Sequence, residues 1–232
     1  MNATAQRRLT AALLIIVPLA FTACFTLLQI QFEYPDILRQ PTGDILAKFQ
    51  RGGPALVGSW YAIALIAFLF IPLVVLAHQL IAARRPLGYL WLASTFGVLA
   101  GLVQTLGFLR WTFVVPQLAA QYLSPAASGA QREAIAVVFD AFHRYAGMAL
   151  GEHLGFLATG LWTALIAAAL VQSGLIKRWL GWIGAALAAG ILAGLLEPAG
   201  WAAAGAINAA SYLLWALWLA AVGAALLGRG ER

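Results

Sequence analysis

Ten side chains that could bind a ligand or move a proton fall within or beside long apolar stretches. They are Gln104, Arg110, Asp140, His143, Arg144, Glu152, His153, Glu197, Trp201 and Asn208. Polar and ionisable groups are costly inside a bilayer, so those that occur there are the first candidates for a functional site. Polar groups above apolar helices are the usual make-up of a ligand pocket. Two carboxyl groups in different environments could also divide the roles of proton donor and base.

The composition explains why these groups stand out. The chain has 232 residues, of which 63% are hydrophobic and 9% charged, and its mean hydropathy is +0.88. Soluble domains average about 45–50% apolar and about 25% charged residues, and disordered chains are polar and charged. The composition therefore excludes both classes and indicates a polytopic membrane protein.

The elements that position the candidates are six apolar stretches of membrane-spanning length. A transmembrane helix needs about 20 apolar residues, and the stretches run over about 9–30, 56–80, 87–115, 146–171, 179–199 and 203–227. We expect an all-α fold, a single membrane domain over residues 1–232 that forms a bundle of six transmembrane helices.

Two segments between the spans are amphipathic, and both are expected on the outer side. The first, about 31–54, contains a short helix that would lie on the membrane surface or cap the bundle. The second, about 131–145, has apolar residues at helical spacing and would extend the fourth helix outward.

Basic residues mark one side of the membrane. They flank the spans at Arg7 and Arg8, Arg84 and Arg85, Lys177 and Arg178, and Arg229 and Arg232. These four places hold eight Lys or Arg and one acid, a net charge of +7, whereas the rest of the chain has a net charge of −1. Positive residues mark the cytoplasm, so both termini are expected there. This bias accounts for the net charge of +6 without a nucleic-acid partner.

The candidates share a depth as well as a polar character. At 1.5 Å per residue, those of the third to sixth helices all fall in the outer half of the bundle. Three of these helices carry glycines four residues apart, a spacing that lets helix backbones approach closely. The glycines occur at Gly97 and Gly101, at Gly147, Gly151 and Gly155, and at Gly190 and Gly194. We therefore expect close packing below a polar outer end.

Several candidates also have a purely structural interpretation. Arg110 could extend to the outer head groups, or it could pair with Glu152 or Glu197. Glu197 precedes Pro198 at a helix end, where water could solvate it. Asp140 and Arg144 could form only a surface ion pair.

Three further residue types leave alternatives open. Trp201 is either part of an interfacial belt or the wall of a pocket. His143 and His153 are about 80° apart around an α-helix, so no metal site is favoured. Cys24, the single cysteine, excludes an intrachain disulfide and is expected in the core. It also ends Phe21-Thr22-Ala23-Cys24, which loosely resembles a lipoprotein cleavage box.

The layout resembles a bacterial six-helix membrane family known as a domain of unknown function, number forty-three eighty-six. The resemblance rests on the basic start Arg7-Arg8-Leu9, the long outer segment after the first helix, and Leu109-Arg110-Trp111 at the end of the third. It covers nearly the whole chain. It implies a multi-pass protein of the bacterial inner membrane and brings no activity, cofactor or functional residue with it.

Three functions fit these observations. We favour an outward-facing polar site that binds a lipid-like or amphiphilic small molecule. The second is an intramembrane acid/base enzyme, an isomerase or cyclase acting on an isoprenoid-like substrate through Glu152 and Glu197. The third is an accessory subunit of a membrane complex. The expected partners are thus the bilayer, an amphiphile, and either another membrane protein or a second copy of the chain. Common nucleotide-binding and hydrolase motifs are absent from the sequence, and the identity of any cofactor stays open.

Overall fold

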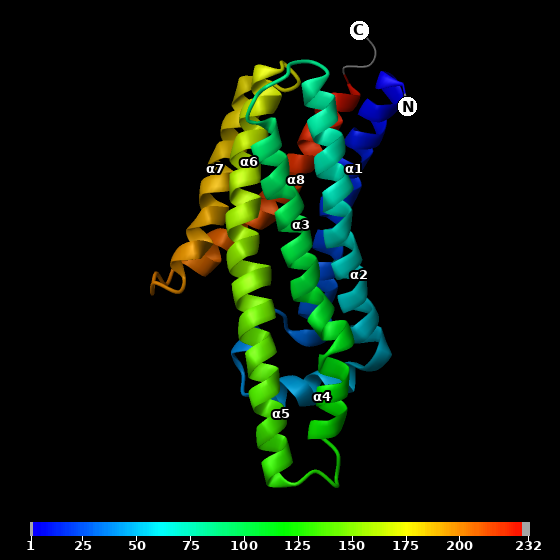
Figure 1. The fold of residues 1–232 in the computed structure, drawn as a ribbon, viewed down its shortest axis with the longest axis vertical. Coiled ribbons are helices and arrows are strands. Elements are labelled where there is room, and N and C mark those ends of the chain that lie inside the picture. Colours follow the sequence, from blue (N-terminus) through cyan, green and yellow to red (C-terminus); the bar gives the residue numbers. More distant parts are fainter. Residues whose placement is uncertain (1, 229–232) are drawn as a thin grey trace.

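Six long helices build the whole of the described fold. The computed structural model describes residues 2–228, and no strand occurs in that range. Six helices are long and apolar enough to cross a membrane: Ala3–Phe32, Thr42–Ala82, Leu90–Tyr122, Gly129–Gln172, Arg178–Leu196 and Ala204–Leu227. The predicted all-α fold with six membrane-length helices is therefore confirmed (Figure 1).

Some of these six long helices consist of successive helical elements, and we call each long helix a rod. In chain order they are α1 (Ala3–Phe32), η1 (Asp36–Arg39), α2 (Thr42–Ala82), α3 (Leu90–Phe113), α4 (Val115–Tyr122), α5 (Gly129–Phe142), η2 (His143–Leu154), α6 (Gly155–Gln172), α7 (Arg178–Ala193), η3 (Gly194–Leu196) and α8 (Ala204–Leu227). The elements η1 and η3 are 3-10 helices, and η2 is a π-helix. The rod α5–η2–α6 runs without a break over Gly129–Gln172.

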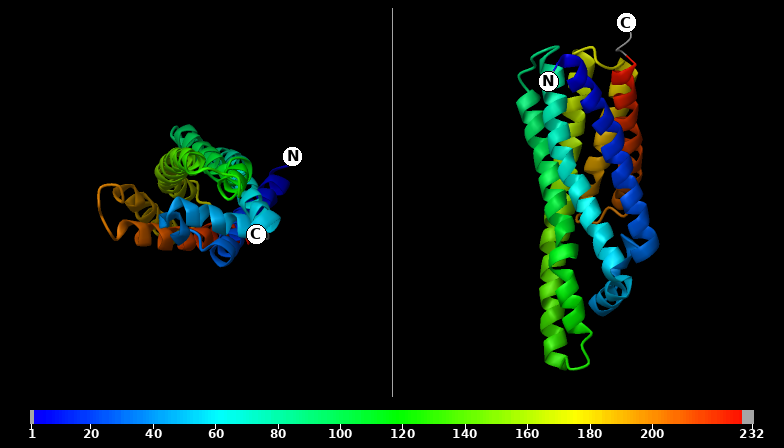
Figure 2. Two further views of the ribbon diagram at one scale, coloured as in Figure 1. Left: turned by 90° about the horizontal axis from the view of Figure 1, so that it is seen from below. Right: turned by 90° about the vertical axis from the view of Figure 1, so that its right-hand side faces the viewer.

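The two ends of the bundle differ. The start of α1, the end of α8 and the short turns after α2 and α6 gather at one end (Figure 1). At the other end, α4 and α5 project beyond the remaining helices as a two-helix arm (Figure 2). Three of the four groups of basic residues that flank the spans thus lie at the end that holds the start of α1. The fourth group, Arg229 with Arg232, lies outside the described residues. We call this end of the bundle the inner end and the opposite end the outer end. The cytoplasmic position of the inner end stays a prediction.

The long second rod contains a sharp change of direction. Gly53 has φ 56° and ψ −154°, a conformation that glycine adopts without steric cost. Pro54 follows it at the first position of the next helical piece, where a missing N–H costs nothing. The preceding amphipathic turn buries Ile45, Leu46 and Phe49. The piece before the bend therefore packs its apolar face inward, and the piece after it crosses the membrane.

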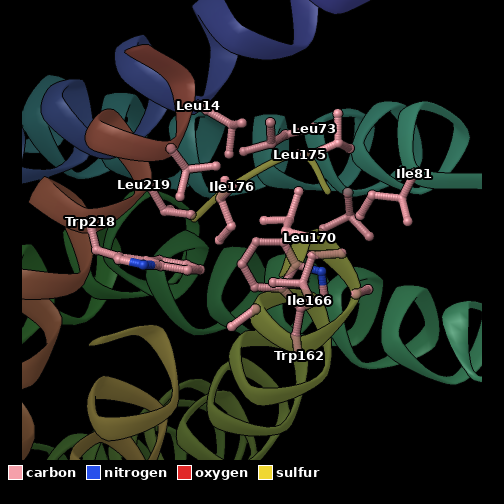
Figure 3. Close-up of a cluster of buried hydrophobic side chains, with 14 of the residues drawn as sticks. Leu14, Leu73, Ile81, Trp162, Ile166, Leu170, Leu175, Ile176, Trp218 and Leu219 are labelled. Atoms are coloured by element: carbon pink, nitrogen blue, oxygen red, sulfur yellow. The ribbon is translucent and has the colours of Figure 1, made fainter. Parts of the chain in front are cut away.

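The inner half of the bundle is an apolar core. Figure 3 shows side chains from α1, α2, α6, α8 and the turn after α6 meeting there, namely Leu14, Leu73, Ile81, Trp162, Ile166, Leu170, Leu175, Ile176, Trp218 and Leu219. Trp218 donates its indole N–H to the carbonyl of Leu180 at 2.8 Å, so its polar atom is satisfied. Near this core, a Cβ atom at Gly223 would lie 2.7 Å from the carbonyl oxygen of Ala11. The backbones of α1 and α8 are therefore in direct contact at the inner end.

The outer half holds a second cluster, which is rich in aromatic rings. Trp60 and Trp111 stack with centroids 4.8 Å apart, and Phe32 contacts both rings edge-on. Tyr34, from the segment after α1, packs against Trp60 at 5.0 Å. We call these four residues, together with Phe49, the outer aromatic cluster. It joins α1, α2 and α3 where the hydrocarbon core of the membrane should end.

Candidate functional site

A cavity of about 630 Å³ opens inside the outer half of the bundle. Its walls come from α1, α2, α3, the η2–α6 rod and α8, and its outer rim includes η1 and the turn after α7. Six of the ten sequence candidates line it: Gln104, Arg110, His143, Glu152, Glu197 and Asn208. The fold thus brings together polar groups that are up to 104 positions apart in the chain.

The other four candidates lie outside the cavity wall. Asp140 and Arg144 form an exposed i, i+4 ion pair at 2.8 Å on the projecting arm. His153 is exposed on the outer face of its helix, although its neighbour Glu152 lines the cavity. Trp201 is 44% exposed in the turn before α8. These four residues therefore do not form the cavity wall.

Depth places the polar end of the cavity near the edge of the hydrocarbon core. The number of residues from Leu90, the first residue of α3, to Arg110 equals the number from Glu152 to Gln172, the last residue of α6. That interval corresponds to roughly 30 Å of helix, which is the thickness of the hydrocarbon core. With the short turns at one face of the membrane, we expect both side chains at the level of the head groups of the opposite face.

Arg110 is the most unusual group in the wall because it is only 7% exposed. Its Nη1 donates a hydrogen bond to the carbonyl of Gly107, and its Cζ lies 5.1 Å from the centre of the Trp111 ring. Gly147 makes room for it, since a Cβ there would lie 2.6 Å from Nη2. In residues 2–228 no carboxylate comes within ion-pair distance of the guanidinium. The surroundings hold the cation in place without giving it an ion pair.

The two carboxylates in the wall have different surroundings. Glu197 lies at the rim, and its side chain is 49% exposed. Its Oε1 lies 3.7 Å from Nη2 of Arg39, so the ion pair links η1 to the turn after η3. Glu152 lies deeper and interacts electrostatically with Arg110, Glu197 and Arg39, but it forms no ion pair within residues 2–228. Glu152 is thus the inner acid of the site.

Tyr34 belongs to the site although its sequence context carries no signal. It is buried in the turn between α1 and η1, and it lines the cavity. Burial raises the pKa of Tyr34 above its ordinary value, and the negative charge of Glu152 adds to this while Arg110 opposes it. The phenol therefore keeps its proton at neutral pH and can donate a hydrogen bond into the cavity.

The π-helix η2 decides which side chains of its rod face the cavity. His143 and Glu152 are nine residues apart, which in an α-helix would place them about 180° apart. A π-helix, with i→i+5 hydrogen bonds, has more residues per turn and therefore brings them closer to one face. Both residues line the cavity. We find no sequence pattern that indicates this widened turn.

Two amides in the wall are held by their neighbours. Gln104 donates from Nε2 to Oγ1 of Thr159 at 3.1 Å. Asn208 donates from Nδ2 to the carbonyl of Ile191 at 2.7 Å, so it ties α8 to α7. Gln104 is thus held to α6 at the cavity wall, and the contact of Asn208 joins two helices.

The cavity reaches the surface of the bundle between α1 and α8. Thr26 and Gln29 on α1 and Ala209 and Leu213 on α8 line it and are also exposed. With Thr22, the two α1 residues form a polar stripe at i, i+4 and i+7, a helical spacing that the sequence displays openly. This surface faces lipid in a membrane, so the site has a lateral opening.

Within residues 2–228, no cluster of three or more His, Cys, Asp or Glu side chains is arranged to hold a metal ion. Cys24, half-buried on α1, packs beside the outer aromatic cluster.

Comparison with known proteins identifies one family. The family model described as Domain of unknown function (DUF4386) matches residues 9–223, nearly the whole chain. No curated protein and no solved structure matches it.

Proposed function

The chain belongs to the DUF4386 family, and we propose that it binds a lipid-like or amphiphilic small molecule in the cavity of its outer half. The head of the ligand would lie among Arg110, Glu152, Gln104 and Tyr34, and its tail would extend toward the centre of the membrane.

One observation carries this proposal: a buried cation without an ion-pair partner in the described chain lines a cavity large enough for a ligand. Leaving a buried charge uncompensated is costly, so such groups are normally paired or serve a site. Ligand pockets typically measure about 300–1,000 Å³, and this cavity of about 630 Å³ lies within that range. An anionic or strongly polar group at Arg110 would supply the missing partner.

The wall changes character with depth in the way an amphiphile requires. Below the polar level it is lined by apolar side chains, among them Val17, Phe70 and Leu219. The opening between α1 and α8 would let the tail remain partly in the bilayer. These features support a ligand that arrives from the membrane rather than from water alone.

Native mass spectrometry of the gently purified protein tests the proposal. We expect one small molecule per chain, released by organic extraction, and Arg110→Gln should lower its occupancy at least about tenfold. Arg144→Gln is the matched control, because that arginine is exposed and outside the cavity wall.

The same experiment separates the proposal from its alternatives. Bulk lipid retained equally by the wild type and by Arg110→Gln would contradict a ligand site at this residue. A stoichiometric protein partner in place of a small molecule would favour an accessory subunit.

A further inference from the structure

We propose that the head of the bound amphiphile is zwitterionic, with an anionic phosphate or carboxylate group at Arg110 and an ammonium group at Glu152. This inference rests on the proposed function and adds the chemical class of the ligand. An aminophospholipid is a molecule of this class.

The balance of charge in the cavity is the first argument. Four ionisable side chains of strong charge line it, two basic and two acidic: Arg39, Arg110, Glu152 and Glu197. Arg39 and Glu197 pair with each other at the rim. Arg110 and Glu152 remain, and the described chain gives neither of them an ion pair. The inner part of the cavity therefore presents one charge of each sign.

A zwitterion is the head group that matches both charges at once. A purely anionic head would satisfy Arg110 but would bring its charge close to Glu152. A neutral head would leave Arg110 and Glu152 without an ion pair, and buried ions are stabilised only by well-placed opposite charges. A phosphate or carboxylate with an attached ammonium gives each ion a charge-assisted hydrogen bond, the stronger kind.

The positions of the two residues are the second argument. Arg110 comes from α3 and Glu152 from η2, on neighbouring rods at the same depth in the membrane. At Gly107 a Cβ atom would lie 2.9 Å from Cα of Gly151, so the two backbones are in contact there. The π-helical turn of η2 directs Glu152 into the cavity, and Gln104 and Tyr34 line the same space. A compact head group could thus meet both charges.

The test uses the full-length protein in nanodiscs that contain equal amounts of phosphatidylethanolamine and phosphatidylglycerol with the same acyl chains. After mild detergent extraction, native mass spectrometry counts the lipids retained per chain. We expect the wild type to retain the ethanolamine lipid about tenfold over the glycerol lipid, the factor that one charge-assisted hydrogen bond provides. Glu152→Gln should bring this ratio close to one by lowering retention of the ethanolamine lipid. Arg110→Gln should lower retention of both lipids.

Matched controls distinguish failure of this inference from failure of the proposed function. Asp140→Asn and Arg144→Gln change an exposed ion pair outside the cavity and should leave the ratio unchanged. Ala209→Trp adds an indole at the opening between α1 and α8 and should lower retention of both lipids.

Each outcome decides a claim. Equal retention of the two lipids by the wild type, or a ratio unchanged in Glu152→Gln, overturns the zwitterionic head and leaves the cavity as a ligand site. If the wild type retains no more lipid than Ala209→Trp does, both the zwitterionic head and the ligand site are overturned. Glu152→Gln is nearly isosteric, so it decides the question even if Arg110→Gln fails to fold.

Discussion

The backbone of Gly147 lies against the guanidinium of Arg110, so closely that a Cβ atom there would come within 2.6 Å of Nη2 and 2.8 Å of Cζ. Glycine is therefore required at this point of η2 for the arginine to keep its position. The contact couples the packing of two rods to the placement of the charge that lines the cavity.

Gly147→Ala should impair binding far more than stability. The new methyl group meets the end of a flexible side chain, which can move aside. Alanine also gains about 0.5–1 kcal/mol over glycine in a helix, which offsets part of the strain. We expect the free energy of unfolding to change by less than about 1 kcal/mol, and lipid occupancy to fall to the level of Arg110→Gln. Native mass spectrometry and thermal unfolding in detergent measure the two effects. Unchanged occupancy would show that the position of the guanidinium is irrelevant to binding.

Gly223→Ala should have the opposite pattern. Here a Cβ atom would lie 2.7 Å from the backbone oxygen of Ala11, which cannot move without shifting α1. We expect a loss of about 1–3 kcal/mol of stability, typical of overpacking. Gly58→Ala is the control, because nothing lies within 4 Å of a Cβ at Gly58. Equal melting temperatures for the two variants would argue against close contact between α1 and α8.

Thiol labelling should locate the open end of the cavity. In a Cys24→Ala background, Gln104→Cys and Glu152→Cys should react with a charged, membrane-impermeant reagent added from the side of η1. Leu99→Cys, whose native side chain is 42% exposed in the middle of α3, should stay unreactive because it faces lipid. Labelling of intact cells also tests the orientation, since we expect η1 on the outside. Reaction only in inverted vesicles would reverse the predicted topology.

The buried phenol of Tyr34 should make stability fall at alkaline pH. Burial raises the pKa of Tyr34 in the folded state. The stability that the buried neutral phenol contributes is therefore complete at pH values below the ordinary tyrosine pKa of about 10. As the pH rises above that value, the unfolded chain ionises first and unfolding becomes easier. Between pH 9 and about 11, the melting temperature of Tyr34→Phe should therefore decline less than that of the wild type. Parallel curves for the two proteins would contradict the burial of this hydroxyl.

Much of the fold could be predicted because the membrane imposes a length on each helix. Apolar runs long enough to cross it are visible without any structure, and Arg84 with Arg85 marks a turn between two of them. The amphipathic pattern around Ile135 and Phe139, both buried, likewise indicates that the fourth span continues outward. In these cases one local property, hydropathy or its period, determines the element.

The depth of the site could also be predicted, but the direction of its side chains could not. Counting residues places Arg110 and Glu152 at one level, since the rise of a helix is nearly constant. The direction of a side chain depends on helix twist, and the π-helical turns of η2 change that twist. His143 and Glu152 consequently line the cavity together, whereas an α-helix would separate them.

Two other features of the site depend on contacts between distant segments. Tyr34 reaches the cavity from a turn whose path is set by packing against Trp60 and Phe25. The cavity itself exists because α1 and α8 touch at Gly223 and leave space farther out. No local pattern encodes either relationship, so neither could be derived from the sequence.

Photo-crosslinking with a phospholipid that carries a diazirine in its acyl chain tests the central claim most directly. After irradiation in nanodiscs, peptide mass spectrometry maps the modified residues. The ligand-binding account predicts preferential modification of the cavity-lining faces of α1 and α8, around Thr26 and Leu213, and its loss in Ala209→Trp. Modification spread evenly over lipid-facing residues such as Leu92 and Ile183, and unchanged in that variant, would contradict a lipid site inside the bundle.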